Sequence, residues 1–567
     1  MQEHVQPHDS FGTQNMQAVS EIHQQDRDVG LTVQSVSELP LSGCLMVDPF
    51  TLRSLQIFVN EQHPSNMGIG KPKEGFSLYG MLHAQCMSNM GKHLLRSWML
   101  CPVVNLASVA DRQNAVQLLM NSPDKALILK NVVKKIQDIP RVLQRLSDAQ
   151  VHPDVQSLQT VVFSLQQLQN LRDIFQQLTS AAPSSMDMTP LQVRYGIFPL
   201  GDLQWSDVSI SHKILTQISS ALRQCEEIIC DIIDFPQEEG FMIKYGVCEE
   251  LDKLKDMYHS LPDTLTMVLQ EELHRIPQHL AQRNSSQLWS IVYLPQIGYV
   301  MQISGAALTD DLADILKDYE HVMEGQADDG APSVYFHTQS TRDLSASVGD
   351  VLYKIQDLEA TLCTELIKRL LLYTPQLLSA ASAVAELDCL LAFASCARDG
   401  SYCRPKLVPE SVLVIDEGRH PLAELVVDTY IPNSTCMDDE GGNRVHIITG
   451  PNASGKSCYI KQVAMIAYMA HLGCFVPAKS ATIGLIDRIF TRLIAGMIYR
   501  ATERSLIIVD EFGKGTLPCD GAGLLSAFVQ HICDAPRRPP RALFSTHFQE
   551  LLDPQVLPKY YSHKHTS

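Results

Sequence analysis

The segment from Gly450 to Ser457 has the residue types and spacing of a loop that binds phosphate groups. An apolar, strand-like run precedes it and a helical pattern over 459–472 follows it, which argues against a chance glycine-rich turn. In such a loop the backbone wraps the phosphates, and its N–H groups and those of the following helix point inward. Lys456 is expected to reach the β- and γ-phosphates of ATP, and Ser457 to bind Mg²⁺. The residues predicted to hold ATP are Gly450, Pro451, Asn452, Ala453, Ser454, Gly455, Lys456 and Ser457.

Two acidic residues, Asp510 and Glu511, stand at the end of a second apolar run. Alone they would most often form a solvated turn, but their position downstream of a phosphate loop favours a role in ATP hydrolysis. Asp510 is expected to hold Mg²⁺ with Ser457, and Glu511 to orient or deprotonate the attacking water. His547 follows a third apolar run; a lone histidine there is usually structural, but beside the other motifs we interpret it as a γ-phosphate sensor. The predicted catalytic residues are therefore Glu511 and His547, and the predicted cofactors are ATP and Mg²⁺.

Helical periodicity dominates the chain between residues 46 and about 400. The pattern predicts one helix over 78–100 that ends before the next proline. Apolar residues also recur at three- or four-residue spacing over 352–370, as in an amphipathic helix. Pro375 is expected to interrupt this helix, which resumes further along the chain.

Two regions depart from the helical pattern. The runs 289–294 and 297–302 are typical of strands and predict a small β-rich insertion at about 275–345. From about residue 405 onward, short β-branched runs alternate with helical patterns, which predicts an α/β layer with a largely parallel sheet.

Composition excludes some classes of protein. The 567 residues carry a formal net charge of -18, which argues against nucleic-acid binding through bulk electrostatics but leaves local basic surfaces open. The sequence has neither a long apolar run nor a secretory signal, so no membrane partner is expected. The 15 scattered cysteines are typical of a reduced, intracellular protein. Residues 1–45 are polar and are interpreted as a disordered tail or the remnant of a missing domain.

These motifs together resemble the MutS family of DNA clamp ATPases. The resemblance covers about residues 45–553 and is carried by motifs at 77–80, 94–98, Arg112, 387–391, 418–422, 431–433, 450–457, 510–516 and 545–548. It implies a mixed fold class: a helical core and lever domain with a small β-rich clamp insertion, followed by an α/β, ABC-type P-loop ATPase domain. The implied domains are the core and levers at 46–400, the clamp at about 275–345, and the ATPase domain at 405–567.

Residues 394–399, 431–435 and 510–516 resemble the meiotic branch of this family. Members of that branch pair with a MutS-family partner of the fourth-homologue type and embrace recombination intermediates such as Holliday junctions. The resemblance implies a nuclear, chromosome-associated, ATP-dependent DNA clamp subunit that promotes crossing over. No mismatch-reading domain is expected, because the chain has its Phe-x-Glu motif only at 548–550.

Two departures from the family pattern bear on activity. Only eight residues, 493–500, stand where the family has a signature loop and helix that contact the partner's ATP, so this signature is expected to be deleted. The chain also ends soon after His547, without the expected helical dimerisation segment. Whether the shortened ATPase domain hydrolyses ATP is left open, as is whether the shortening comes from splicing or from the gene model.

Two alternatives to the clamp therefore stay open: a non-catalytic interaction protein, and a chromosome-structural ATPase, which the lack of long heptad repeats disfavours. No residue is assigned to DNA binding. Lys244, Arg275 and Arg283 lie near or in the predicted clamp, but a basic residue on a helix is usually solvated.

Overall fold

The structure is a computed structural model, and it forms two units. It describes residues 43–61, 73–147, 155–180, 203–235, 240–275, 289–304, 319–326, 332–438, 444–492, 499–512, 517–534, 538–548, 551 and 561–565. Of the tail predicted at 1–45, residues 1–42 lie outside the described part of the chain. The prediction is wrong at its end, because Leu45 is buried and its backbone N donates to Pro102 O at 2.8 Å. The first unit comprises Met1–Gln144, Phe163–Arg223 and Pro375–Ser567, and the second comprises Arg145–Val162 and Gln224–Thr374.

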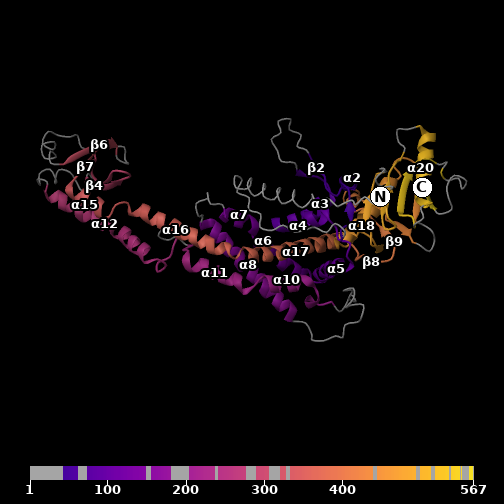
Figure 1. Ribbon diagram of the computed structural model, residues 1–567, viewed down its shortest axis with the longest axis horizontal. Coiled ribbons are helices and arrows are strands. Elements are labelled where there is room, and N and C mark those ends of the chain that lie inside the picture. The colour runs from indigo at the N-terminus through magenta and orange to yellow at the C-terminus, as the bar shows by residue number, and fades with distance from the viewer. Residues whose placement is uncertain are drawn as a thin grey trace, which may run out of the picture. The chain divides into compact units, whose positions relative to one another are not determined.

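The helix-rich part of the first unit contains α2 (Pro49–Ser54), α3 (Leu78–His83), α4 (Asn89–Leu100), α5 (Leu106–Asn121), α6 (Pro123–Lys135), α10 (Ser209–Gln217) and α17 (Thr374–Asp399). The helices α7 (Ile139–Ser147), α8 (Val155–Ser180) and α11 (Ser220–Ile232) include residues of both units, and the first residue of α17, Thr374, belongs to the second unit. Helix α17 lies along α4, where the rings of Trp98 and Phe393 are 6.1 Å apart (Figure 1). By length and composition α17 qualifies as a membrane-spanning candidate, but 78% of its most apolar window is buried inside the protein.

The single helix expected over 78–100 is wrong, because the structure has two helices there. Helix α3 ends at His83, and α4 begins at Asn89 after Ser88, whose side chain accepts a hydrogen bond from Gly91 N. Ser88 is fixed by Asp388 of α17, whose carboxylate accepts hydrogen bonds from its backbone N and its hydroxyl, both at 2.7 Å. A contact from a distant part of the chain therefore breaks a continuous local pattern.

The expected interruption at Pro375 is confirmed, since α17 begins at Thr374.

The first unit also holds a six-stranded, fully parallel sheet in the order β1-β13-β14-β15-β11-β16. Its strands are β1 (Met46–Val47), β13 (Arg488–Phe490), β14 (Leu506–Val509), β15 (Arg541–Thr546), β11 (Val445–Thr449) and β16 (Tyr561–His565). Helices α18 (Lys456–Leu472) and α20 (Pro518–Cys533) pack on this sheet. The predicted largely parallel sheet is thus confirmed.

A second, mainly antiparallel sheet has the order β10-β9-β12-β8. Its strands are β8 (Lys406–Val408), β9 (Leu413–Gly418), β10 (Asn433–Met437) and β12 (Ser480–Gly484), and a short pair, β2 (Asn60–Glu61) and β3 (Lys73–Glu74), stands apart. The fifteen cysteines all lie within the described residues, and none of them is in a disulfide.

In the second unit two long helices lead to a small sheet (Figure 1). Helices α12 (Glu249–Arg275) and α16 (Val351–Leu371) lie side by side. The antiparallel sheet has the order β4-β5-β7-β6, with β4 (Trp289–Leu294), β5 (Gly298–Ser304), β6 (Glu320–Gln326) and β7 (Pro332–His337), and α15 (Gln339–Ser347) follows it. The two strands predicted in this region are confirmed, and the mixed, helix-rich fold class with small sheets is confirmed as well.

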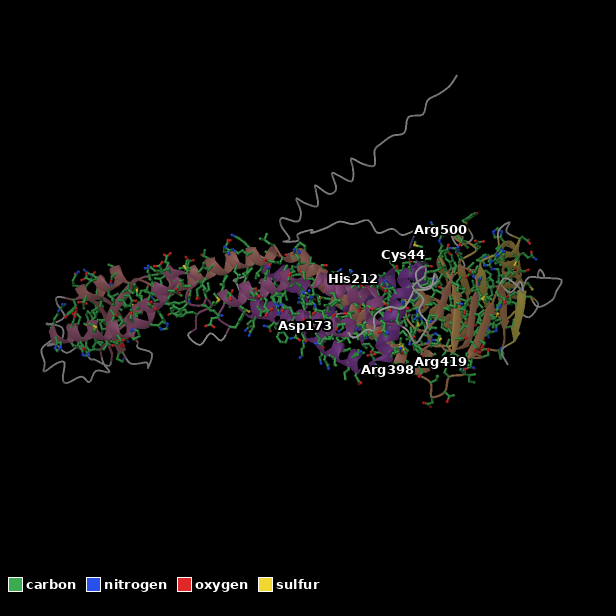
Figure 2. All side chains as sticks on the ribbon, turned by 90° about the horizontal axis from the view of Figure 1, so that it is seen from below. Cys44, Asp173, His212, Arg398, Arg419 and Arg500 are labelled. Atoms are coloured by element: carbon green, nitrogen blue, oxygen red, sulfur yellow. The ribbon has the colours of Figure 1, made fainter. Side chains whose placement is uncertain are left out.

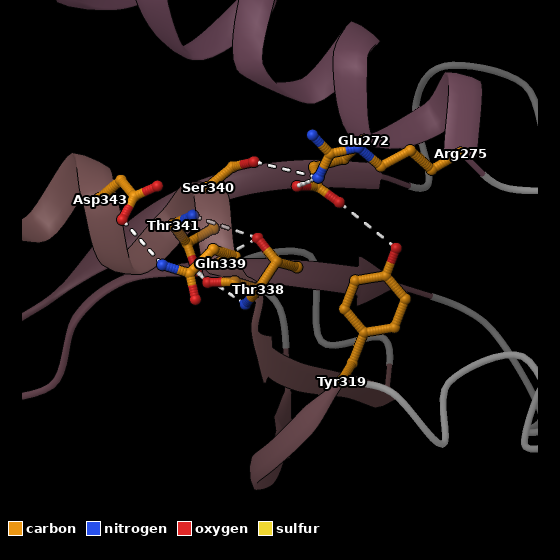
Figure 3. A network of polar contacts seen from close by, with 8 residues as sticks. All are labelled: Glu272, Arg275, Tyr319, Thr338, Gln339, Ser340, Thr341 and Asp343. Carbon is orange, nitrogen blue, oxygen red and sulfur yellow. Dashed lines mark hydrogen bonds and ion pairs between the residues drawn. The ribbon is translucent and has the colours of Figure 1, made fainter.

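A buried carboxylate fastens this small sheet to the end of α12 (Figure 3). Glu272, 1% exposed, accepts hydrogen bonds from Arg275 Nη1 at 2.9 Å and from the Tyr319 hydroxyl at 3.3 Å. Arg275 also donates to the hydroxyl of Ser340 on α15 at 3.4 Å (Figure 3). Because the carboxylate is paired on both sides, its burial is tolerated.

Candidate nucleotide-binding site

The predicted phosphate loop connects β11 to α18 at the carboxyl end of the parallel sheet. Ala453 and Gly455 have φ of 63° and 86°, which turns the backbone back on itself before α18 begins. Lys456 is 5% exposed, and its Nζ donates hydrogen bonds of 2.7 Å to the carbonyl oxygens of Gly450 and Pro451. Lys456, near the end of the loop, is therefore hydrogen-bonded to the first two residues of the loop.

Parallel register brings the other predicted residues to the same edge. Strand β15 lies between β14 and β11, with Phe544 opposite Val509 and Thr546 opposite Thr449. The residues that follow β14 therefore come close to the start of α18. The Ser457 hydroxyl donates to Asp510 Oδ1 at 2.9 Å, so the two residues predicted to bind Mg²⁺ are in direct contact.

Glu511 and His547 lie at the same edge. Their side chains are 31% and 42% exposed, and His547 Nε2 is 3.8 Å from Glu511 Oε1. Glu511 adopts φ of 46°, the left-handed region that is uncommon for a residue with a side chain. The structure thus brings together the acid, the histidine and the phosphate loop that the sequence singled out separately.

The arrangement fits a magnesium–nucleotide group by its donor set. Mg²⁺ prefers hard oxygen ligands and is usually held by one or two protein groups plus phosphate oxygens. Ser457 supplies a hydroxyl and Asp510 a carboxylate, while Lys456 and the N-terminus of α18 supply the positive charge that phosphates require. The Ser457 hydroxyl oxygen and Asp510 Oδ1 are 2.9 Å apart, so both could bind the same ion.

A cavity of about 430 Å³ lies beside the loop and includes Ser457, Cys458, Lys461, His420, Leu422 and Val426 in its lining. The Tyr430 hydroxyl, near this cavity, donates to Gln462 Oε1 at 2.9 Å and contacts Cys458 Sγ at 3.5 Å. Burial lowers the pKa of His420 to about 4, and the positive charge of Lys461 acts in the same direction. The Nδ1 of this neutral histidine accepts from the backbone N of Ala423 at 3.2 Å, which orders the turn beside the cavity.

Arg419 fastens the same turn to the end of α17. Figure 2 labels Arg419 beside Arg398, which lies in the last turn of that helix. The Nη2 of Arg419 donates to Gly400 O at 2.9 Å, and its Nη1 pairs with Glu424 at 3.0 Å. The sequence marked residues 418–422 only through the family resemblance, so the roles of Arg419, Tyr430 and Gln462 were not predicted.

A compact turn precedes β14. Asp487 accepts hydrogen bonds from the Thr502 hydroxyl at 2.6 Å and from the Ser505 hydroxyl at 2.9 Å. Residues 493–498 themselves lie outside the described part of the chain. Strand β14, and with it Asp510, is therefore anchored at its amino end by the contacts of Thr502 and Ser505 with Asp487.

The basic residues considered for DNA binding lie in different settings. Lys244 is exposed, and its Nζ donates to Cys230 O at 2.7 Å. Arg275 is engaged with Glu272, and Arg283 lies outside the described residues. DNA-contacting residues thus stay unassigned.

Comparison with known proteins places both halves of the chain in one family. The model of MutS domain III matches residues 50–394, and that of MutS domain V matches residues 446–497 and 493–566. The two domain V segments meet at 493–497, within the segment that the sequence marked as shortened. The division of this match agrees with a loss inside the domain.

Individual MutS proteins are also similar in sequence to most of this chain. The chain is 28% identical over 594 aligned positions to MutS protein homolog 5 of Saccharomyces cerevisiae, covering 97% of this chain and 62% of the yeast protein. It is 28% identical over 543 positions to DNA mismatch repair protein MutS of Bacteroides thetaiotaomicron, covering 92% of this chain and 56% of that protein. With the MutS of Chlorobaculum tepidum the identity is 30% over 487 positions, covering 82% and 50%.

The chain thus spans about half to three fifths of the length of these relatives. The domain III match alone, at 50–394, covers more than half of the chain. This chain belongs to the MutS family.

Proposed function

We propose that this chain is an ATP-dependent DNA clamp subunit that acts on meiotic recombination intermediates and promotes crossing over. The observation that carries the proposal is the 2.9 Å contact between Ser457 and Asp510 beside Lys456, which unites two separate sequence motifs in one Mg²⁺–ATP site. The likeness to the yeast MutS protein homolog 5 over 97% of the chain supports the meiotic role.

In this proposal residues 46–400 form the core and lever domain, with the clamp at about 275–345, and residues 405–567 form an ABC-type ATPase domain. The two long helices of the second unit and their four-stranded sheet are suited to reach around DNA. The partner is a MutS-family subunit of the fourth-homologue type, and the complex acts in the nucleus on chromosomes.

At the site, Lys456 and the backbone N–H groups of the loop bind the β- and γ-phosphates. Ser457 and Asp510 hold Mg²⁺, which neutralises charge on the phosphates when bound. Glu511 orients or deprotonates the attacking water. His547, whose Nε2 is 3.8 Å from Glu511 Oε1, senses the γ-phosphate. Clamp closure on DNA would follow from ATP binding, and hydrolysis would reset it.

A non-catalytic interaction protein is the competing function. The short segment 493–500 and the divided domain V match favour it, because a deleted signature would remove the contact to a partner's ATP. The two functions differ in whether the chain binds ATP and whether ATP changes its hold on DNA.

The test uses the full chain with its MutS-family partner and a fluorescent four-way DNA junction. The clamp proposal predicts junction binding that ATP alters, with Glu511→Gln prolonging the ATP-bound behaviour because hydrolysis is blocked while binding is kept. Binding that is identical with and without ATP, in both the unchanged protein and the variant, would favour the interaction protein.

A further inference from the structure

We infer that Ser545 is a positioning residue that sets the orientation of both Asp510 and Glu511. The inference rests on the proposed function of the same site in binding Mg²⁺–ATP. It adds a residue that the phosphate loop and the acidic pair do not include, and that none of the predicted roles covers.

Ser545 bridges the two acidic residues from the neighbouring strand. Its hydroxyl donates to Asp510 Oδ1 at 2.6 Å and accepts from the backbone N of Glu511 at 3.0 Å. The side chain is 0% exposed, so water does not compete for these bonds. Since a hydroxyl has one proton to give, the donation to Asp510 fixes its direction.

Two hydroxyls converge on one carboxylate oxygen, because Ser457 also donates to Asp510 Oδ1 at 2.9 Å. Hydrogen bonds to an ionised carboxylate are among the stronger ones in proteins. When Ser457 turns its lone pairs toward a metal ion, Ser545 still holds the carboxylate in place. Ser545 therefore preorganises the metal ligand without contacting the metal.

The bond to Glu511 N has a separate consequence. Glu511 has φ of 46°, a conformation that is unfavourable for a residue with a side chain. The Ser545 hydroxyl accepts a hydrogen bond from the backbone N–H of this strained residue. Ser545 thus stabilises the backbone conformation of Glu511. This conformation determines the direction of the Glu511 carboxylate, which must reach the attacking water.

The same sheet provides a matched control in Ser505, at the other end of β14. Ser505 is also 0% exposed, donates to Asp487 Oδ1 at 2.9 Å and accepts from Thr502 N at 2.9 Å. It makes the same kinds of bond as Ser545, but away from the phosphate loop. A stability loss common to any such serine will therefore appear in Ser505→Ala as well.

The experiment compares Ser545→Ala, Ser545→Cys, Ser545→Thr and Ser505→Ala in the full chain with its partner. Binding of a fluorescent ATP analogue is titrated with Mg²⁺, kcat and KM for ATP are measured where hydrolysis occurs, and thermal unfolding is followed for each. Ser545→Ala is expected to raise the Mg²⁺ midpoint about tenfold, the size expected for one lost hydrogen bond to a charged group.

The Mg²⁺-independent binding of the analogue should be unchanged, and kcat should fall more than KM rises. Cys keeps the shape of serine but bonds poorly, so it should behave as Ala does, whereas Thr should restore the midpoint. An unchanged Mg²⁺ midpoint in both Ser545→Ala and Ser545→Cys would overturn the inference, as would an equal shift in Ser505→Ala. No analogue binding by the unchanged protein would instead contradict the proposed function, and the inference with it.

Discussion

Asp388 and Ser88 lie three hundred positions apart in the chain, yet the carboxylate of Asp388 caps the start of α4 by accepting from both the backbone N and the hydroxyl of Ser88. The other carboxylate oxygen accepts from Met87 N at 2.9 Å. Asp388 is 0% exposed, and a Cβ added to Gly91 would lie 2.2 Å from Asp388 Oδ2. The junction between α4 and α17 is therefore built around a carboxylate that faces only donors.

We predict that Asp388→Asn is nearly as harmful as Asp388→Ala, although asparagine has almost the shape of aspartate. Both oxygens of Asp388 accept, so an amide NH₂ would face a donor and leave a buried group unpaired, at a cost of about 1–3 kcal/mol. Thermal unfolding and limited proteolysis of the full chain measure the loss. Asp357→Asn, at an exposed position on α16, is the control and should change little. An Asp388→Asn protein as stable as the original would contradict this account of the junction.

We predict that loss of a buried ion pair in the second unit lowers stability more than loss of an exposed pair whose lysine lies on the same helix. Lys255 and Glu359 are 1% and 4% exposed with Nζ and Oε1 3.5 Å apart, and Glu359 also accepts from Met242 N and Ile243 N. Lys255→Met leaves the carboxylate buried without its cation, which should cost about 3–5 kcal/mol.

The control is Lys253→Met on the same helix. Lys253 pairs with Glu249 at 2.8 Å, but the two side chains are 72% and 86% exposed, so its loss should cost under about 1 kcal/mol. Hydrogen exchange of the segment 240–275 reports on this unit directly. Equal protection in the two variants would argue against a structural role for the buried pair.

His471 should make the stability of the protein depend on pH. Burial lowers its pKa from 6.5 to about 4; its Nδ1 lies 2.7 Å from Ala467 O, and its Nε2 accepts from Ile486 N at 2.9 Å. Because the unfolded chain binds a proton at higher pH than the folded one, this contribution is complete above pH 6.5 and is lost as the pH falls toward 4.

At pH 5 the loss should be about 2 kcal/mol relative to pH 8. The difference in unfolding free energy between the original protein and His471→Gln should therefore shrink by that amount on acidification. His420 should add a further pH dependence of stability, equal in both proteins. Unfolding midpoints between pH 8 and 5 measure this effect. His212→Gln, at an exposed position, should show no such change; a constant difference for His471→Gln would refute the assignment.

The end of the phosphate-loop helix depends on one glycine. Gly473 has φ of 88°, and a Cβ there would lie 2.8 Å from Cβ and 3.0 Å from Cδ of Arg112, whose Nη1 donates to Leu472 O at 2.9 Å. Gly473→Ala should therefore destabilise the first unit by about 1–3 kcal/mol. Gly523→Ala is the matched control, because a Cβ at this position in α20 meets nothing within 4 Å, and it should be neutral or slightly stabilising. Denaturant unfolding distinguishes the two, and similar midpoints would contradict the contact.

Structural features could be predicted from the sequence where they depend on residues that are close together in the chain, and not where they depend on contacts between distant segments. The phosphate loop and its flanking strand and helix were predictable because phosphate binding constrains neighbouring residues. The break at Ser88 was not, since it depends on Asp388 from another part of the chain.

Ser545 was likewise missed as a site residue, although its place beside Thr546 and His547 offered a signal. Its role depends on strand order, which puts β15 next to β14 and could not be deduced from spacing alone. Tyr430 and Gln462 meet for the same reason, through packing of α18 near β10.

The most direct test of the central claim is crosslinking of ATP to the purified chain, alone and with its MutS-family partner, in the presence and absence of Mg²⁺. The account predicts Mg²⁺-dependent labelling that disappears in Lys456→Ala, because the phosphates lose their cation, and that persists in Lys125→Ala, at an exposed position on α6 of the same unit. Labelling that is absent from the unchanged protein in both settings, or that survives in Lys456→Ala, would contradict it.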